Sequence, residues 1–503
     1  MNILGLRQTG QMAFNFFDRL SPKLLIFGIL ALCYFSLVPN ANEEQYLALA
    51  KQFGDSNWIP QSINLSEFPG TRIIYQSFFG FVLKHIGFGA TIGIFRIVLI
   101  LLILVPIAKI YESLKFTNTE ILIHLGVLFI AQQSLFAGSF IFLSVESKCF
   151  SYVAVFWAIY FMIKSKQAYM VAFLIVATYL HALVGFWSAF YIFASQILFS
   201  SFSWKSFKKP TLSGLAYSAA ILPFVFYLMN AIEAIPNQIP TSDWIYTYFR
   251  SPHHTALAPD FSYFYQNHFY GILWTAVGVL FVFDIVRRKP EILESKLAKF
   301  ALVALTGSVV LVCLAFIDRE GKFLKYYPYR IMTLATFLLF LILTKRIGGL
   351  THTIGKIRLL FYSLLLSGVM LLEVIIPNLK NNFALTSDTY KDLLAATAYI
   401  KENSEKDAII FSMFEDNKMI RLTERNAFAS YKFVPAESTK LHDWYERVLA
   451  TREIQLNPTA LLEFSKEYRI DYVISDEPLP KEIDREAVFQ QGDYFIYNLS
   501  QPD

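Results

Sequence analysis

The sequence predicts an α-helical polytopic membrane protein with a small soluble α/β domain at its C-terminal end. Of the 503 residues 55% are hydrophobic and only 17% are charged, and the apolar residues gather in long runs. This composition excludes an ordinary soluble enzyme of this length. The net charge of +5 is modest and no basic module is visible, so we expect no nucleic-acid partner. The three cysteines are far apart and favour neither a disulfide framework nor a zinc knuckle.

The apolar runs predict about eleven membrane spans, because a hydrocarbon core of roughly 30 Å requires about 20 mainly apolar residues per helix. The first run lacks a cleavage site of small residues and is followed by many others, so we expect a signal anchor. The expected spans are 22–39, 89–111, 120–143, 149–164, 167–184, 186–202, 212–231, 269–287, 299–317, 329–345 and 358–377.

The charges of the connecting links predict a cytoplasmic N-terminus. With this orientation every inside link is basic and the outside links carry acids, and an odd number of spans places the C-terminal domain outside. The inside cations are Arg7, Arg19, Lys23, Lys109, Lys115, Lys164, Lys166, Lys205, Lys208, Lys209, Arg287, Arg288, Lys289, Lys345, Arg346, Lys356 and Arg358. The outside acids are Glu43, Glu44, Asp55, Glu67, Glu146, Glu233, Asp243 and Asp260.

Two domains follow from the change in composition along the chain. We expect a transmembrane domain over 1–377, with long outside loops at 40–88 and 232–268, and a soluble extracytoplasmic α/β domain over 378–503. Within the first loop, amphipathic patterns at 43–53 and 71–86 predict two interfacial helices. In the soluble domain, helical patterns at 387–404 and 458–468 alternate with strand patterns at 407–414, 469–477 and 493–499.

The stretch "VPNANEEQYLALAKQF" places two adjacent acids just after the first span. On a helix that begins near Asn42, Glu43 shares a face with Tyr46, whereas Glu44 is turned about 100° away. Carboxylates in a first helical turn also stabilise the helix through its dipole. By itself this stretch therefore favours helix capping.

A second outside acid makes a catalytic interpretation equally plausible. Glu146 and Lys148 lie in a tight outside turn, "SVESKCFSY", between the third and fourth expected spans, at the same membrane depth as Glu43. Two outside acids on neighbouring spans suit general-base catalysis on a hydroxyl group. The alternative is that Glu146 and Lys148 only flank a turn.

Together these motifs resemble the GT-C superfamily of membrane glycosyltransferases, in particular its protein O-mannosyltransferase and lipid A aminoarabinose transferase branch. The first-loop stretch "NEEQYLALAK" is similar to that family's Asp-Glu pair followed by a Tyr, and "ESKCFSY" is similar to its second, acid-bearing turn. The motifs that resemble the family lie within about the first 190 residues, and the rest of the chain resembles it only in its overall architecture. It implies a GT-C-like fold.

One position departs from the family pattern. Counted back from Tyr46, the family's catalytic Asp falls on Asn42, which is not a base, and the Glu that follows falls on Glu43. Either Glu43 or Glu44 has taken over the role, or this is a non-catalytic binding or scaffold member. We favour Glu43 as the base, with Glu44 as second choice and Glu146 as partner.

The resemblance implies attack by an acceptor nucleophile on the anomeric carbon of a polyprenyl-phosphate sugar at the outer leaflet. Such a donor requires cations for the phosphate and an apolar groove for the lipid. The stretch "DREGKFLKYYPYR" supplies Arg319, Lys325 and Arg330, and a guanidinium suits bidentate phosphate contact. Lys148 is a further donor-site candidate. Snorkelling to lipid phosphates explains Lys325 equally well.

The loop "RSPHHTA" is the other site candidate, with Arg250, His253 and His254. We expect hydrogen bonds from these residues to phosphate or sugar hydroxyls. A divalent metal held by His253, His254 and Glu43 is possible but not favoured, so the cofactor stays undetermined. His181 lies at the outside end of the fifth expected span, at the same membrane depth as the candidate acids. A histidine at the membrane interface is, however, more often an ordinary hydrogen-bonded residue than a catalytic one.

Three other functions compete with a glycosyltransferase. A polysaccharide polymerase or ligase would also use a polyprenyl-linked donor, with more reliance on Arg and His, and a non-catalytic GT-C scaffold would fit Asn42. A transporter is disfavoured, because Asp284 is the only obvious acid within an expected span. The expected partners are the lipid-linked donor, a glycan, lipid or protein acceptor, and membrane lipid. We expect a bacterial inner membrane, with the C-terminal domain in the periplasm.

Overall fold

The computed structural model describes residues 19–66, 68–200, 204–229, 239–288, 292–349, 356–414, 417–435 and 437–500. Outside the described residues lie Arg7, Glu67, Glu233, Lys289 and the 232–238 part of the second outside loop, and the side chains of Lys205, Lys356 and Arg358 are not described. The chain forms two compact units. The first comprises Met1–Phe35, Phe95–Val225 and Tyr246–Leu379, and the second comprises Ser36–Ile94, Phe226–Ile245 and Lys380–Asp503.

The membrane part is built from apolar helices. Among the described residues, six helical segments are long and apolar enough to cross a membrane, and five further apolar helices are shorter. Each of the eleven expected spans overlaps one of these helices. The prediction of a multi-pass helical membrane protein is therefore confirmed.

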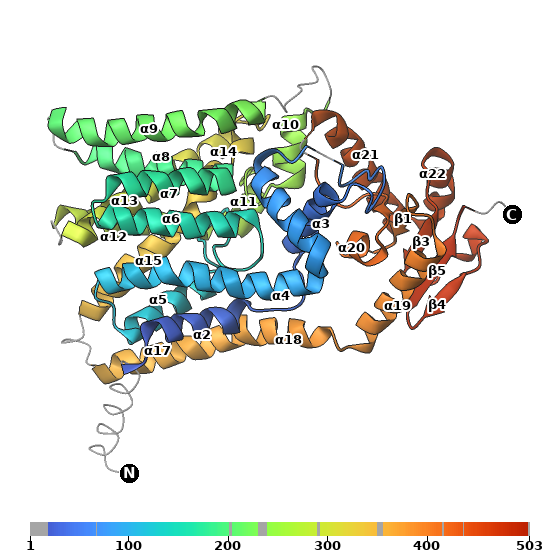
Figure 1. The fold of residues 1–503 in the computed structure, drawn as a ribbon, viewed down its shortest axis with the longest axis horizontal. Coiled ribbons are helices and arrows are strands. Elements are labelled where there is room, and N and C mark those ends of the chain that lie inside the picture. Colours follow the sequence, from blue (N-terminus) through green and yellow to red (C-terminus); the bar gives the residue numbers. More distant parts are fainter. Residues whose placement is uncertain are drawn as a thin grey trace, which may run out of the picture. The chain divides into compact units, whose positions relative to one another are not determined.

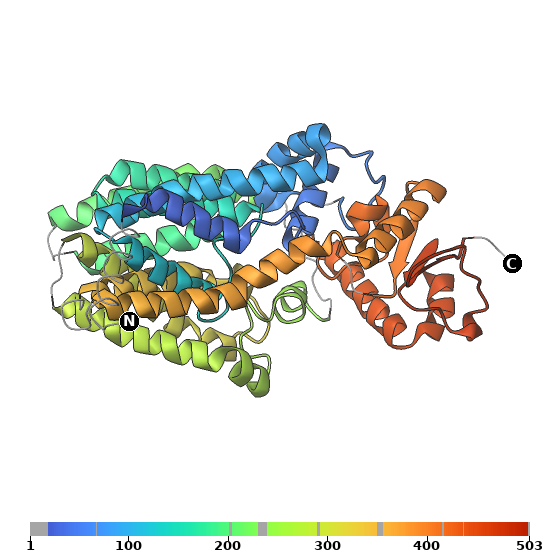
Figure 2. The same cartoon turned by 90° about the horizontal axis from the view of Figure 1, so that it is seen from below.

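The helices of the first unit run close to a common direction, as Figure 1 and the view from below in Figure 2 show. Helix α6 packs against α7, α7 against α8, and α13 against both α12 and α15. In the buried core the rings of Phe156 and Phe337 lie 4.8 Å apart. The main helices are α2 (Pro22–Tyr34), α5 (Asn118–Ile130), α6 (Ser147–Ile163), α7 (Gln167–Leu180), α8 (Ala182–Leu198), α9 (Trp204–Met229), α12 (Tyr270–Arg287), α13 (Ile292–Leu311), α15 (Met332–Gly349) and α17 (Lys356–Met370).

Shorter helical segments lie between these helices or continue them. They are η2 (Ile245–Arg250), α11 (Phe261–Phe264), η3 (Tyr265–Phe269), α14 (Leu314–Ile317), η4 (Leu324–Tyr326), η5 (Pro328–Ile331) and η6 (Leu371–Ile375), with α18 (Ile376–Ala384) after η6.

The expected helix over 120–143 is wrong in its second half. A capping box between Thr117 and Glu120 begins α5, but the helix ends at Ile130. Residues 131–145, called the extended segment below, continue as turns, bends and irregular backbone to Glu146. The side chain of Gln133 replaces the missing helical hydrogen bonds. Its Oε1 accepts from the amides of Ile141 and Phe142 at 2.8 and 2.9 Å, and its Nε2 donates to the Phe142 carbonyl at 2.8 Å.

In the second unit, both helices expected in the first outside loop are present. Helix α3 (Ala41–Gly54) covers the first pattern, and the second forms the start of α4 (Ile73–Ser113), which is interrupted by the left-handed Gly87 at φ 71°. The backbones of α3 and α4 touch at Gly54 and Gly80: a Cβ on Gly54 would lie 2.7 Å from the Gly80 carbonyl carbon. Only glycine permits this approach.

A mixed five-stranded sheet with the order β2-β1-β3-β5-β4 forms the core of the C-terminal part. Strand β1 is parallel to β2 and β3, whereas β5 is antiparallel to β3 and β4. The strands are β1 (Ile409–Ser412), β2 (Asn426–Ala427), β3 (Tyr472–Ser475), β4 (Phe489–Gln491) and β5 (Tyr494–Asn498), and the helices are α19 (Asp388–Asn403), α20 (Met419–Thr423), α21 (Ser438–Leu456) and α22 (Leu461–Glu467). The α/β character is confirmed.

The first outside loop belongs to this second unit. The amide of Asn64 donates to the carbonyl of Ala427 at 2.6 Å, and the backbone N–H of Ile63 donates to the side chain of Asn426 at 3.2 Å. These contacts join the loop to the edge strand β2, across about 360 residues of sequence. Composition alone did not indicate this association.

Candidate functional site

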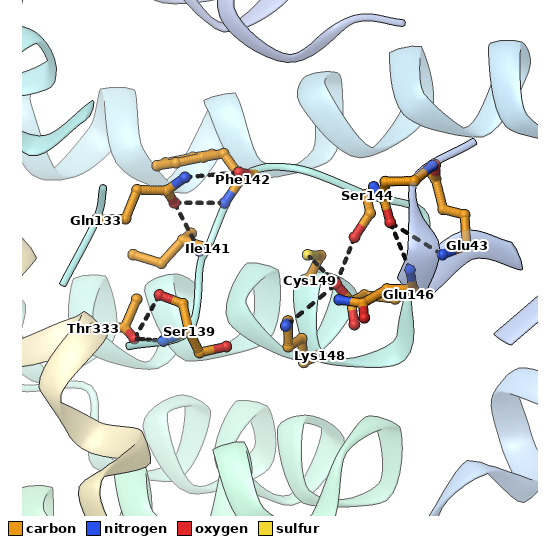
Figure 3. A network of polar contacts seen from close by, with 12 residues as sticks. Glu43, Gln133, Ser139, Ile141, Phe142, Ser144, Glu146, Lys148, Cys149 and Thr333 are labelled. Atoms are coloured by element: carbon orange, nitrogen blue, oxygen red, sulfur yellow. Dashed lines mark hydrogen bonds and ion pairs between the residues drawn. The ribbon is translucent and has the colours of Figure 1, made fainter. Parts of the chain in front are cut away.

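Glu146 occupies the N-cap position of α6, without a capping hydrogen bond from its side chain, and forms a buried ion pair with Lys148. The Lys148 Nζ lies 3.4 Å from Glu146 Oε1, and the two side chains are 6% and 0% exposed. The Ser144 hydroxyl donates to the same carboxylate oxygen, as Figure 3 shows. A buried charge is tolerated only when it is paired and hydrogen-bonded in this way.

The ammonium group of Lys148 also lies over an aromatic ring. Its Nζ is 3.5 Å from the centroid of Phe140, within the range of a cation–π contact. Phe140 belongs to the extended segment that follows α5. The Glu146 carboxylate and this segment together therefore hold the cation at the beginning of α6.

Arg330 reaches the same extended segment from η5. Its Nη1 donates to the Ser139 hydroxyl at 3.0 Å, and its guanidinium lies 4.6 Å from the centroid of the Tyr327 ring. Its Nε has no hydrogen-bond partner among the described residues. Arg330 lies close enough to Lys148 for their charges to repel. The group thus carries two cations and one carboxylate, which is a suitable balance for an anion.

Thr333, one turn after Arg330, fixes the backbone of the segment. Its hydroxyl donates to the Ser139 carbonyl at 3.0 Å, while the Ser139 N–H lies 3.4 Å from the same oxygen. The hydroxyl of Thr336, in the next turn of α15, accepts from the Leu135 N–H at 3.2 Å. The start of α15 therefore holds the segment in place.

A cavity of about 850 Å³ lies beside this segment, within the first unit. Ser139 and Phe140 line it together with His253 from the second outside loop. The cavity is large enough for a sugar and part of a lipid, since small-molecule sites occupy about 300–1,000 Å³.

Two further polar residues on this cavity were missed by the sequence analysis. Glu373 lies in η6, inside the last expected span, so the statement that Asp284 is the only acid within a span is wrong. The ring of His268 is buried, and neither of its nitrogens has a hydrogen-bond partner among the described residues. A rule that flags every ionisable residue within an apolar run would have found Glu373.

The structure brings the second outside loop to Arg330 through Tyr327. The Tyr327 hydroxyl donates to the Ser251 hydroxyl at 3.0 Å, and its ring lies 6.1 Å from that of His254. The rings of His253 and His254 are 3.9 Å apart, and Arg250 is buried at the start of this loop. Of the residues in "RSPHHTA", His253 is the one that lines the cavity.

His181, Lys325 and Arg319 occupy positions with evident local roles. His181 caps α8, and its Nδ1 accepts from the Val184 N–H at 3.3 Å. Lys325 lies 5.4 Å from the Tyr326 ring centroid, and Arg319 donates to the Ala258 carbonyl at 3.3 Å. None of the three lines the large cavity.

Glu43 and Glu44 lie in the second unit. Asn40 and Glu43 form a capping box at the start of α3: the Asn40 side chain accepts from the Glu43 N–H, and Glu43 Oε2 accepts from the Asn40 N–H at 3.0 Å. Both carboxylate oxygens of Glu44 accept from Arg421, at 2.7 and 2.8 Å. The two adjacent acids thus have different surroundings, as the helical spacing predicts.

No group of three or more His, Cys, Asp or Glu side chains with metal-ligand spacing occurs in the described part of the chain.

Comparison with known proteins adds little. A family model described as "Domain of unknown function (DUF6798)" matches residues 391–451. The crystal structure of ArnT from Cupriavidus metallidurans bound to undecaprenyl phosphate is similar at 11% identity over 100% of both chains, with a TM-score of 0.46. No curated protein matches the sequence.

Proposed function

We propose that this protein is a membrane glycosyltransferase that moves a sugar from a polyprenyl-phosphate donor to an acceptor hydroxyl. The observation that carries the proposal is that Lys148, paired with Glu146, contacts Phe140 and that Arg330 contacts Ser139. Phe140 and Ser139 line the 850 Å³ cavity, whereas the three charged residues lie behind this lining. The motif resemblance to GT-C enzymes supports it. The acceptor is a glycan, a lipid or a protein, and the enzyme acts at the outer, periplasmic face of a bacterial inner membrane.

The two cations would hold the donor phosphate. Arg330 is fixed by Ser139 and Tyr327, which leaves its Nε edge for a phosphate oxygen. An ordered guanidinium next to an ammonium group stabilises the negative charge that develops on a phosphate leaving group. His253, on the wall of the same cavity, would hydrogen-bond to the sugar or the phosphate.

The acid that activates the acceptor is either Glu43 or Glu146. Both side chains are fully buried, and each lies at the start of a helix. We retain Glu43 as the proposed base and Glu146 as its partner, which also orients Lys148. Glu44 is less suited, because Arg421 occupies both of its oxygens.

Each of two alternative functions is supported by one observation. The Arg250, His253 and His254 loop suits a polysaccharide polymerase or ligase, whose product would be a lengthened or transferred glycan chain. The capping-box role of Glu43 suits a non-catalytic scaffold. Analysis of the product separates the first alternative from the proposal, and a complete lack of turnover would favour the second.

The test is transfer of radiolabelled sugar from a panel of polyprenyl-phosphate sugars by the full-length protein in proteoliposomes. Glu43→Gln and Glu146→Gln should each lower kcat about 10²–10⁴-fold, the usual contribution of a general acid or base. The exposed acid Asp55, on the same outside loop as Glu43, provides the control, and Asp55→Asn should leave kcat unchanged. Full activity of Glu43→Gln would exclude Glu43 as the base, and full activity of both variants would exclude carboxylate catalysis.

A further inference from the structure

A second cavity, of about 460 Å³, lies at the opposite ends of the first unit's helices from Glu146. It is formed where α6 and α8 end and where α9 and α13 begin. Helix α6 separates it from Glu146 by 17 residues, or about 25 Å. This cavity is therefore distinct from the candidate active site.

Three lysines line this cavity: Lys209 from α9, and Lys296 and Lys299 from α13. None of the three forms an ion pair with a described carboxylate. Lys209 lies near enough to Lys296 for the two charges to repel. Three cations around one cavity repel each other unless an anion lies between them.

Lys296 is held rigidly by the end of α6. Its ammonium group donates to the carbonyls of Met162 and Ile163, at 3.3 and 2.9 Å, and to the hydroxyl of Ser165. These bonds satisfy carbonyls that a helix end leaves without partners. Its hydrogen-bonding capacity is thus largely used, but its charge still acts in the cavity.

Lys209 and Lys299 have no such hydrogen bonds among the described residues. The Nζ of Lys299 lies 5.4 Å from the ring centroid of Phe199, which also lines the cavity. Ser200 and Ser206 also line the cavity. A cavity lined by lysines, serines and an aromatic ring suits an anionic head group attached to an apolar body.

We propose that this cavity binds a phosphate-bearing anion, which Lys209 and Lys299 contact directly. An anionic phospholipid head group and a free phosphate share this chemistry. The site is independent of the proposed glycosyltransferase activity, and the expected topology places it on the cytoplasmic side.

The test measures Tm and native mass spectra of the full-length, delipidated protein in detergent, with phosphatidylglycerol, phosphatidylcholine or inorganic phosphate added. Ligand binding to the folded state raises Tm. Phosphatidylglycerol should raise Tm and remain bound. Lys209→Gln and Lys299→Gln should each weaken this binding roughly fivefold, the effect of about one lysine at an anionic surface.

Lys208 provides a matched control, because it is adjacent to Lys209 and exposed but does not line the cavity. Lys208→Gln should bind as the unchanged protein does. An equal shift with inorganic phosphate would identify a free anion as the ligand, and a shift with phosphatidylglycerol alone would identify the lipid. The proposal is overturned if phosphatidylcholine acts as strongly as phosphatidylglycerol, if neither anion shifts Tm, or if Lys208→Gln weakens binding as much as Lys209→Gln.

Discussion

Glu44 illustrates how a single residue can resemble a catalytic acid in sequence while its contacts favour a structural role. Its side chain is 1% exposed, and the bidentate contact to Arg421 joins α3 to α20 within the second unit. Nothing near either residue indicates the pair, since 377 positions separate the two. Helical spacing could separate Glu43 from Glu44, but it could not name their partners.

We predict that Glu44→Gln destabilises the second unit by about 1–3 kcal/mol, because it leaves the Arg421 guanidinium, which is only 14% exposed, without its counter-charge. The measurement is the free energy of unfolding from hydrogen exchange of the α3 and α20 amides. The exposed pair Asp388–Lys391 is the control, and Lys391→Gln should cause no measurable change. Equal stability of Glu44→Gln and the unchanged protein would show that the contact is dispensable.

At the scale of elements, the sequence predicted those helices and strands whose signal lies in residues close to each other in the chain. Apolar runs indicated the eleven described apolar helices, and short runs of β-branched and aromatic residues indicated β1, β3 and β5, because both signals lie within a few neighbouring residues. The end of α5 at Ile130 was not predictable in this way. The polar triplet 132–134 follows Ala131, but the chain then returns to a mainly apolar composition, so the run as a whole still resembles one span. The helix is replaced by hydrogen bonds between the side chain of Gln133 and residues eight and nine positions later.

A substitution of Gln133 therefore tests whether its side chain stabilises the extended segment. Gln133→Leu preserves the approximate volume but leaves the amides of Ile141 and Phe142 buried without acceptors, so we expect a loss of at least about 2 kcal/mol. Gln132 is exposed and serves as the control, and Gln132→Leu should change stability by less than about 0.5 kcal/mol. Thermal unfolding in detergent measures both, and similar Tm values for the two variants would refute the assigned role.

At the scale of the whole molecule, composition predicted a membrane part and a soluble part, but not which loop joins the soluble part. The first outside loop was expected with the membrane domain, whereas Asn64 and Ile63 form hydrogen bonds with β2. Lys51 of α3 also lies 3.5 Å from Glu424, which lies 3.2 Å from Lys401 of α19. Such contacts depend on the folded chain, so no local pattern contains them.

This three-residue cluster predicts how the second unit responds to acid. Burial would raise the pKa of Glu424, but the charges of Lys51 and Lys401 outweigh burial and hold that pKa below its ordinary value of 4.5. A carboxyl whose pKa is depressed on folding stabilises the protein above its unfolded pKa. This stability is lost as the pH falls through the folded pKa, so the second unit should lose stability below about pH 4.5.

Hydrogen exchange of α3 and α19 from neutral to acidic pH measures this effect. In Glu424→Gln the same amides should exchange faster at neutral pH and should show a weaker dependence on acid. Parallel pH profiles for the variant and the unchanged protein would assign the acid sensitivity to other carboxyls, such as Asp407, whose pKa a hydrogen bond from Arg469 also lowers.

The extended segment after α5 has a consequence for biogenesis. Its backbone groups at Leu135 and Ser139 bond to Thr336 and Thr333, which the ribosome adds about 190 to 200 residues later. Until α15 has entered the membrane, these polar groups lack their native partners, and burying them in lipid would cost several kcal/mol each. A nascent chain that stops before α15 would therefore expose an incompletely bonded segment, which membrane quality-control proteases could recognise as a sign of unfinished insertion.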